Sequence, residues 1–175
     1  MKMLHTPIGK EILRELKAGD EVSISGTIFT ARDAAHKKMM ALLDEGKSLP
    51  FDIEGQVIYH VGPCPARPGQ VIGSAGPTTS SRMNLYTPRL IELGLAGFIG
   101  KGLIDQRTID IMAKHTAVYF GAIGGAGALI SRYIKEEKII AFPELGTEAI
   151  RMLTVENFSS VVVVDSHGNN LHERI

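Results

Sequence analysis

The 175-residue sequence has one cysteine, Cys64, no excess of either charge and no long apolar run. A single cysteine cannot form an intrachain disulfide, and alone it cannot hold a metal cluster or a structural zinc ion. The 19 basic residues balance the 19 acidic ones, so no overall field draws the chain to nucleic acid or to an anionic membrane. Any site for an anion must therefore be local.

The sequence also lacks the apolar segments that direct a chain to a membrane. The first residues, MKMLHTPIGKEIL, reach charged side chains before any long apolar stretch, which is not the pattern of a secretory signal. No apolar run approaches the length of a membrane span. We therefore expect a cytoplasmic protein, folded as a single domain over residues 1–175.

The hydrophobic pattern predicts an α/β fold with a mixed sheet. Strand patterns and helix patterns alternate between about residues 97 and 141, whereas strand-rich stretches lie nearer both ends. The pattern of residues 148–157 favours a strand but also fits a helix. Strands are expected at 21–31, 56–62, 71–76, 98–102, 117–124 and 148–157, and helices at 7–18, 32–45, 87–97, 105–114 and 124–134.

The stretch GPTTSSRMN, residues 76–84, places four hydroxyl side chains, Thr78 to Ser81, between a Gly-Pro turn and Arg82. Gly, Pro, Ser, Thr and Asn all favour turns, so an exposed turn is the simpler interpretation. The alternative is a cradle in which hydroxyls, backbone N–H groups and the guanidinium converge on a carboxylate or phosphate. The stretch alone favours the turn.

Two further cations lie where a strand pattern ends. Arg32 stands at a strand-to-helix junction, where a cation is unfavourable unless an anion binds there too. His36, one turn later, is expected on the solvated face of that helix. Lys101 lies between two glycines, which leave room for a ligand to approach its ammonium group, although a lysine in a tight turn is the simpler interpretation of this motif alone. Arg32, Arg82 and Lys101, together with the hydroxyls, suggest a small dianionic ligand.

Two other motifs give weaker signals. The segment GAIGGAGAL, 121–129, lacks both the G-x-G-x-x-G frame and the Gly-Lys-Ser/Thr of phosphate loops, so close backbone packing is expected there. Cys64 lies between prolines, and Arg67 is its only nearby hint of a positive field. The roles of these segments and of His36 stay open.

Several motifs in fixed order resemble the β subunit of class I fumarate hydratases and of the related L-tartrate dehydratase. They cover roughly residues 5–170 and are TARDAAH, YHVGPCPARPG, GPTTSSRM, IGKG, GAIGGAGAL and FPELGTEAI. The resemblance implies a swivelling β/β/α domain with a mixed sheet. It also favours the anion cradle over the turn for Thr78 to Arg82.

The resemblance implies half of an iron–sulfur hydro-lyase that interconverts fumarate and (S)-malate. A separate α subunit would carry the [4Fe-4S] cluster, and we expect a hetero-oligomer of two α and two β chains. By matching motifs, Thr78 would exchange the C3 proton of the substrate and Thr79 would contact it. Arg32, Arg82 and Lys101 would hold its carboxylates.

The sequence departs from the family pattern at Ser81, Asn84 and Leu103, where Gly, Asp and Asn are expected. These departures leave the choice between fumarate, tartrate and mesaconate open. Two other interpretations also stay open. One is a stand-alone module that binds a small anion or a nucleotide through residues 121–127, and the other is a non-catalytic scaffold for the α subunit.

Overall fold

The computed structural model describes residues 1–123 and 127–174. Within these ranges, seven strands form one mixed sheet, in the order β1-β2-β3-β4-β5-β7-β6, and a further pairing of β2 with β7 closes it. The strands are β1 (Lys2–His5), β2 (Glu21–Thr30), β3 (Val57–Tyr59), β4 (Gly97–Gly100), β5 (Val118–Ala122), β6 (Ile134–Ala141) and β7 (Ile150–Val164). Strands β1 to β5 pair in parallel, and β7 pairs antiparallel with its neighbours. The predicted α/β class with a mixed sheet is confirmed.

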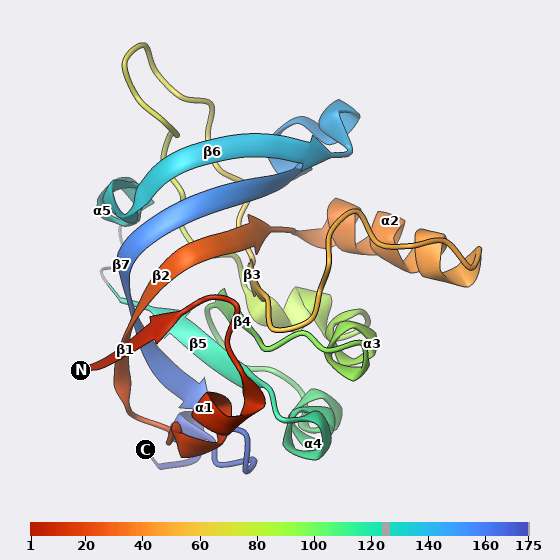
Figure 1. The fold of residues 1–175 in the computed structure, drawn as a ribbon, viewed down its shortest axis with the longest axis vertical. Helices are drawn as coiled ribbons and strands as arrows, with labels where there is room; N and C mark the ends of the chain where they lie inside the picture. The colour runs from red at the N-terminus through yellow and green to blue at the C-terminus, as the bar shows by residue number, and fades with distance from the viewer. Residues whose placement is uncertain (124–126, 175) are drawn as a thin grey trace.

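Helices cover one side of this closed sheet. Figure 1 shows α2, α3 and α4 together on that side, with α1 beside the lower end of the strands. None of the described helices is both long enough and apolar enough to cross a bilayer. The α-helices are α1 (Lys10–Glu15), α2 (Asp33–Asp44), α3 (Thr87–Glu92), α4 (Gln106–His115) and α5 (Gly127–Ile130), and the 3₁₀ turns are η1 (Ser80–Met83), η2 (Ser131–Tyr133), η3 (Pro143–Glu148) and η4 (Leu171–Arg174).

Alternate residues of the parallel strands enter two separate cores. In β5, Val118 and Phe120 point into the cluster enclosed by the strands, whereas Tyr119 lies in the cluster between the sheet and the helices. Successive side chains of a strand point to opposite faces, and both faces are covered here. The outer cluster brings Tyr119 against Phe98, with ring centroids 4.8 Å apart, under the edge of the sheet where the predicted site residues lie.

Several predicted elements agree with the structure. The helix expected at 32–45 is α2, and Asp105 caps α4 by accepting a hydrogen bond from the Thr108 amide at 2.9 Å. Of the strand predicted at 148–157, residues 150–157 belong to a strand, which runs on without a break to Val164 as β7, whereas Glu148 ends η3. The helix expected at 7–18 is confined to Lys10–Glu15, and the start of the one expected at 124–134 lies outside the described residues.

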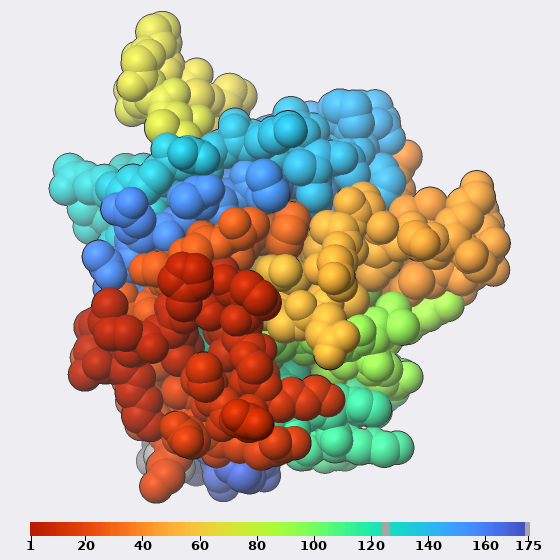
Figure 2. Space-filling model, viewed as in Figure 1, coloured from red at the N-terminus to blue at the C-terminus, as the bar shows by residue number. Residues whose placement is uncertain are grey.

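The strand predicted at 71–76 is wrong. The chain there forms one arm of a loop whose arms bond to each other, from the Cys64 amide to the Ser74 carbonyl and from the Gly73 amide to the Cys64 carbonyl. Pro63 and Pro65 have no N–H group, so the other arm cannot provide a regular ladder. Figure 2 shows this yellow loop projecting from the body. The sequence pattern also missed β1, a short strand in which only Leu4 is buried.

Candidate active site

Two of the predicted cations, Arg32 and Lys101, and one histidine, His60, lie at the carboxyl ends of three neighbouring parallel strands. Arg32 follows β2 by two residues, His60 directly follows β3, and Lys101 directly follows β4. The carboxyl ends of parallel neighbours meet at one edge of a sheet, which is where open α/β sheets bind ligands. Strands β3 and β4 each stop directly before a polar residue, whereas β2 is followed by the buried Ala31 before Arg32.

The hydroxyl-rich segment runs along this edge as an extra length of extended chain. The Thr78 amide donates to the His60 carbonyl at 2.7 Å, and the Lys101 amide donates to the Thr78 carbonyl at 3.3 Å. Thr79 and Lys101 pair as a parallel bridge, and the Ser80 amide donates to the Lys101 carbonyl at 2.9 Å. The structure thus brings Thr78, Thr79 and Lys101 side by side.

Both predicted arginines are paired with carboxylates that the sequence did not reveal. Arg82 donates from Nε to Asp33 Oδ2 at 3.1 Å, and its Nη2 lies 2.8 Å from Asp33 Oδ1. The Nε atom of Arg32 lies 3.5 Å from Glu148 Oε1. The exposed pair of Arg82 with Asp33 contributes about 0–1 kcal/mol, so a substrate carboxylate can compete with Asp33. The Arg32–Glu148 pair is half-buried, and Arg32 Nε has no hydrogen-bond partner among the described residues. Within residues 1–123 and 127–174, Lys101 has no carboxylate partner.

His36 does not lie on the solvated face of its helix, contrary to prediction. Its side chain is buried, and its Nδ1–H donates to the Arg32 carbonyl at 2.7 Å. The ring packs edge-on against His60 and stacks with Tyr86. Burial lowers the pKa of His36 to about 4, with opposing contributions from the Arg32 hydrogen bond and the Asp33 charge. The ring is therefore neutral near pH 7.

His60 and Ser80 also belong to this edge; sequence reasoning missed His60 and named Ser80 only as one of the four hydroxyls of the possible cradle. His60 Nδ1 lies 2.9 Å from Ser80 Oγ, and both side chains are buried. Gly100 leaves space for them, because a Cβ there would overlap Ser80 Oγ. The glycine before Lys101 therefore makes room for the Ser80 side chain inside the protein. A polar residue directly after a buried strand was the available signal for His60.

Cys64 lies outside this group. Its side chain is exposed and lines a cavity of about 450 Å³ together with Arg67 and Arg132. No cluster of three or more His, Cys, Asp or Glu side chains suited to a metal ion occurs in the part of the chain that the structure describes. The expectation for residues 121–129 falls partly on 124–126, outside the described residues.

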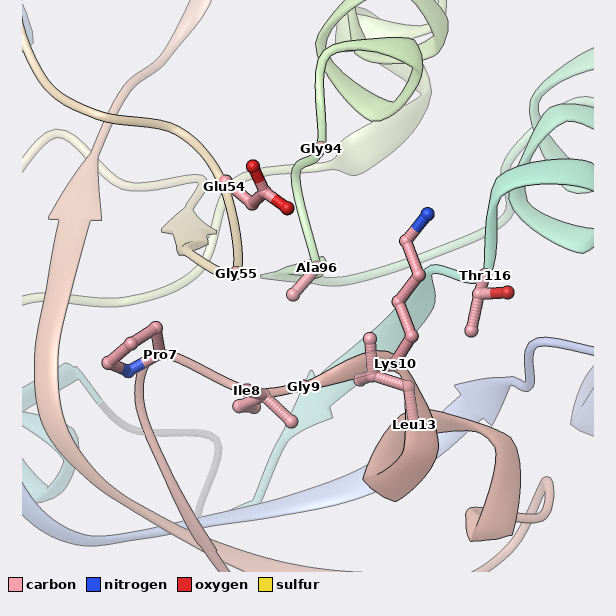
Figure 3. A pocket seen from close by; sticks show the side chains of 10 residues that line it. All are labelled: Pro7, Ile8, Gly9, Lys10, Leu13, Glu54, Gly55, Gly94, Ala96 and Thr116. Carbon is pink, nitrogen blue, oxygen red and sulfur yellow. The ribbon is translucent and has the colours of Figure 1, made fainter.

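A second cavity, of about 350 Å³, lies at the amino ends of the strands. Figure 3 shows it between the start of α1 and the segments that lead into β3, β4 and β5. Lys10, Glu54 and Thr116 supply its polar side chains, and Ile8 and Leu13 lie on its apolar side. None of the predicted site residues lines this cavity, so it is separate from the group at the carboxyl ends.

The fold and the site define an α/β protein with cations and hydroxyls gathered at one edge of its sheet, an arrangement suited to a small anion. The chain belongs to the family described as Fumarase C-terminus, whose model matches residues 2–175. The resemblance drawn from the sequence motifs is thereby confirmed.

Curated relatives agree with this membership. The chain is 39% identical over 171 residues to the anaerobic class I fumarate hydratase of Escherichia coli K12, which covers 95% of this chain and 31% of that protein. It is 36% identical over 181 residues to a Methanocaldococcus jannaschii protein provisionally named as the beta subunit of an L(+)-tartrate dehydratase, covering 100% of this chain and 93% of that protein. The chain therefore spans about a third of the fumarate hydratases that it matches.

Proposed function

We propose that this chain is the β subunit of an iron–sulfur-dependent hydro-lyase that reversibly hydrates fumarate to (S)-malate. The observation that carries the proposal is the pairing of Thr78 and Thr79 with Lys101, at the edge where Arg32 and Arg82 also lie. Two carboxylates need cations at two places, and proton exchange at C3 needs a group between them.

The residues of this chain would act as follows. Arg32, Arg82 and Lys101 hold the substrate carboxylates, and Thr79 contacts the substrate. Thr78 gives a proton to C3 during hydration and removes it from C3 of malate during dehydration. A threonine hydroxyl is a poor base in water, so its alkoxide needs a nearby cation. Lys101, in the neighbouring segment of the same chain, is suitably placed.

The [4Fe-4S] cluster that the family implies does not fit this chain. Such a cluster is held by several thiolates, whereas Cys64 is the single cysteine, is exposed and lies in the projecting loop. We therefore assign the cluster to an α partner, in a complex of two α and two β chains. That assignment agrees with the short span of this chain relative to the fumarate hydratases.

L-tartrate is a second candidate substrate, because the relative whose length this chain matches carries the tartrate dehydratase name. Asn84, one of the departures from the family pattern, accepts a hydrogen bond from the Asp105 amide at 3.4 Å. The two substrates are distinguished by kcat/KM for malate and for L-tartrate, measured with the same reconstituted complex.

Thr78→Val tests the chemistry, because it preserves the shape and removes the hydroxyl. In the complex with the α partner, we expect kcat for malate dehydration to fall about 10²–10⁴-fold, the range for general acid–base catalysis. KM should change far less, because the cations provide most of the ground-state binding. Thr78→Ser is the matched control and should keep partial activity. A fully active valine variant would favour the scaffold interpretation or move the proton transfer to another residue.

A further inference from the structure

Four polar side chains are buried directly under the proposed site, on four separate parts of the chain. Each is about 1% exposed. A core built for stability alone is filled with apolar groups, because a buried polar group is costly unless it is fully paired. We call this group the buried polar column; its members are His36, His60, Ser80 and Tyr119.

Members of the column contact one another in sequence. His60 packs edge-on against His36, with ring centroids 5.4 Å apart, and its Nδ1 lies 2.9 Å from Ser80 Oγ. Burial raises the pKa of Tyr119 to about 12, and a hydrogen bond with the Ser80 side chain opposes that rise. The geometry thus links the Ser80 hydroxyl directly to the imidazole of His60.

Each member also bonds to a main-chain atom of the proposed site, His36 and Tyr119 through their side chains and His60 and Ser80 through their own backbone. His36 donates to the Arg32 carbonyl, and the carbonyl of His60 accepts the Thr78 amide at 2.7 Å. The Ser80 amide donates to the Lys101 carbonyl at 2.9 Å, and Tyr119 donates to the Gly102 carbonyl at 2.8 Å. The column thus touches the backbone on both sides of the Thr78–Lys101 pairing.

The column is maintained against two local costs. His60 Nε2 is buried and has no hydrogen-bond partner among the described residues. Burial, followed by the nearby His36 ring, lowers the pKa of His60 well below its usual range, so the ring is neutral. In addition, residue 100 is a glycine, and any Cβ there would overlap Ser80 Oγ. The glycine at residue 100 fits a requirement for the Ser80 hydroxyl at that place, because it leaves the space that the hydroxyl occupies.

We infer that Ser80 and His60 are positioning residues, whose hydrogen bond under the sheet edge fixes the Thr78 hydroxyl relative to the Lys101 ammonium. This inference rests on the proposed function, because the position of Thr78 matters for catalysis only if Thr78 exchanges the proton. Neither Ser80 nor His60 needs to touch the substrate. A misplacement of about 1 Å at a reacting group can cost about 10²-fold in rate, which gives such a support a measurable effect.

Ser80→Ala in the complex with the α partner is the central test. We expect kcat for malate dehydration to fall about 10–100-fold with KM changed less than about 3-fold, because the three cations remain in place. Ser160→Ala is the matched control, since Ser160 is a buried serine of β7 whose hydroxyl has no partner among the described residues. It should leave both constants unchanged.

A second measurement does not depend on catalysis. Amide hydrogen exchange at Thr78 and Lys101 should be at least about 10-fold faster in Ser80→Ala than in Ser160→Ala, because the segment loses its lateral support. His60→Asn, which keeps a polar atom near the position of Nδ1, should restore slow exchange and most of kcat relative to His60→Phe, which keeps only the ring. Tyr119→Phe is a second probe if Ser80→Ala does not fold.

The outcomes separate the two proposals. An inactive wild-type complex with slow exchange at Thr78 that Ser80→Ala accelerates would contradict the hydro-lyase function and retain the support of the segment. An active complex in which Ser80→Ala changes neither kcat nor exchange would overturn the inference. Faster exchange with unchanged kcat would also overturn it, because the support would then have no catalytic consequence.

Discussion

Gly100→Ala perturbs the site edge with one methyl group. The added Cβ would overlap Ser80 Oγ and would lie 3.2 Å from both Ser80 Cβ and His60 Nδ1. Ser80 cannot simply move aside, because it is buried and its amide is bonded to the Lys101 carbonyl. The conflict must therefore be resolved by a shift of the segment or by loss of the Ser80–His60 hydrogen bond.

The expected loss of stability follows from these contacts. Overpacking of a close-packed site costs about 1–3 kcal/mol, and leaving a buried hydrogen-bonding group unpaired costs about 1–3 kcal/mol. Replacing a strand glycine by alanine returns about 0.5–1 kcal/mol, because glycine loses more conformational freedom on folding. Together these ranges give an expected net loss of about 1–5.5 kcal/mol in the free energy of unfolding, measured by urea denaturation of the isolated chain.

Two comparisons make this prediction specific. Gly9→Ala is the matched control, since Gly9 has an extended backbone and nothing lies within 4 Å of an added Cβ; its effect should stay within about 0.5 kcal/mol. Adding Ser80→Gly to Gly100→Ala removes the overlapping atoms and should recover part of the loss. A Gly100→Ala variant as stable as Gly9→Ala would refute the reasoning, as would a double variant with no recovery.

Two further predictions concern a charge at the site and the buried imidazoles. Arg82→Lys should lower kcat/KM for malate dehydration in the complex by a factor corresponding to about 1.5–3 kcal/mol, because an ammonium lacks the planar fork that binds a carboxylate. An unchanged value would exclude Arg82 from substrate binding. The stability of the chain should fall as the pH drops from about 6.5 toward 4, by up to about 1.4 kcal/mol per pH unit for each ring. The reason is that His36 and His60 have lowered pKa values, so both rings stay neutral in the folded chain but take up protons in the unfolded chain. Urea denaturation should show a shallower fall for His36→Gln.

The sequence predicted what depends on local pattern. The positions of Arg32 and Lys101 at strand ends could be predicted because each follows an apolar run and stands beside a helix start or a glycine, and strand ends of a parallel sheet meet in space. The helix at 32–45 and the cap at Asp105 follow from periodicity and capping chemistry in the same way. These features need no knowledge of which distant segments come together.

What the sequence could not predict depends on distant pairing. Arg82 and Asp33 are 49 positions apart, and His60 and Ser80 are 20 apart, so no local spacing indicates either contact. The prediction that the His36 side chain is solvated is wrong, because the sequence of the helix alone gives no sign that this side chain packs against His60 at the end of β3. The strand prediction for 71–76 was wrong for the converse reason. The apolar residues there resemble those of a strand, but the segment around Cys64 that bonds to them contains Pro63 and Pro65.

The closed sheet explains why the chemistry of this chain is confined to an edge. Its interior is filled by apolar side chains, so a ligand cannot enter between the strands. At the edge, Arg82 and Lys101 are exposed, and the attraction between unit charges 4 Å apart is only about 1 kcal/mol in water. The same attraction is about 4 kcal/mol at an effective dielectric constant of about 20, near a protein surface from which water is partly excluded. Under the proposed function, a partner that covers this edge would therefore strengthen the hold on the substrate without adding any cation of its own.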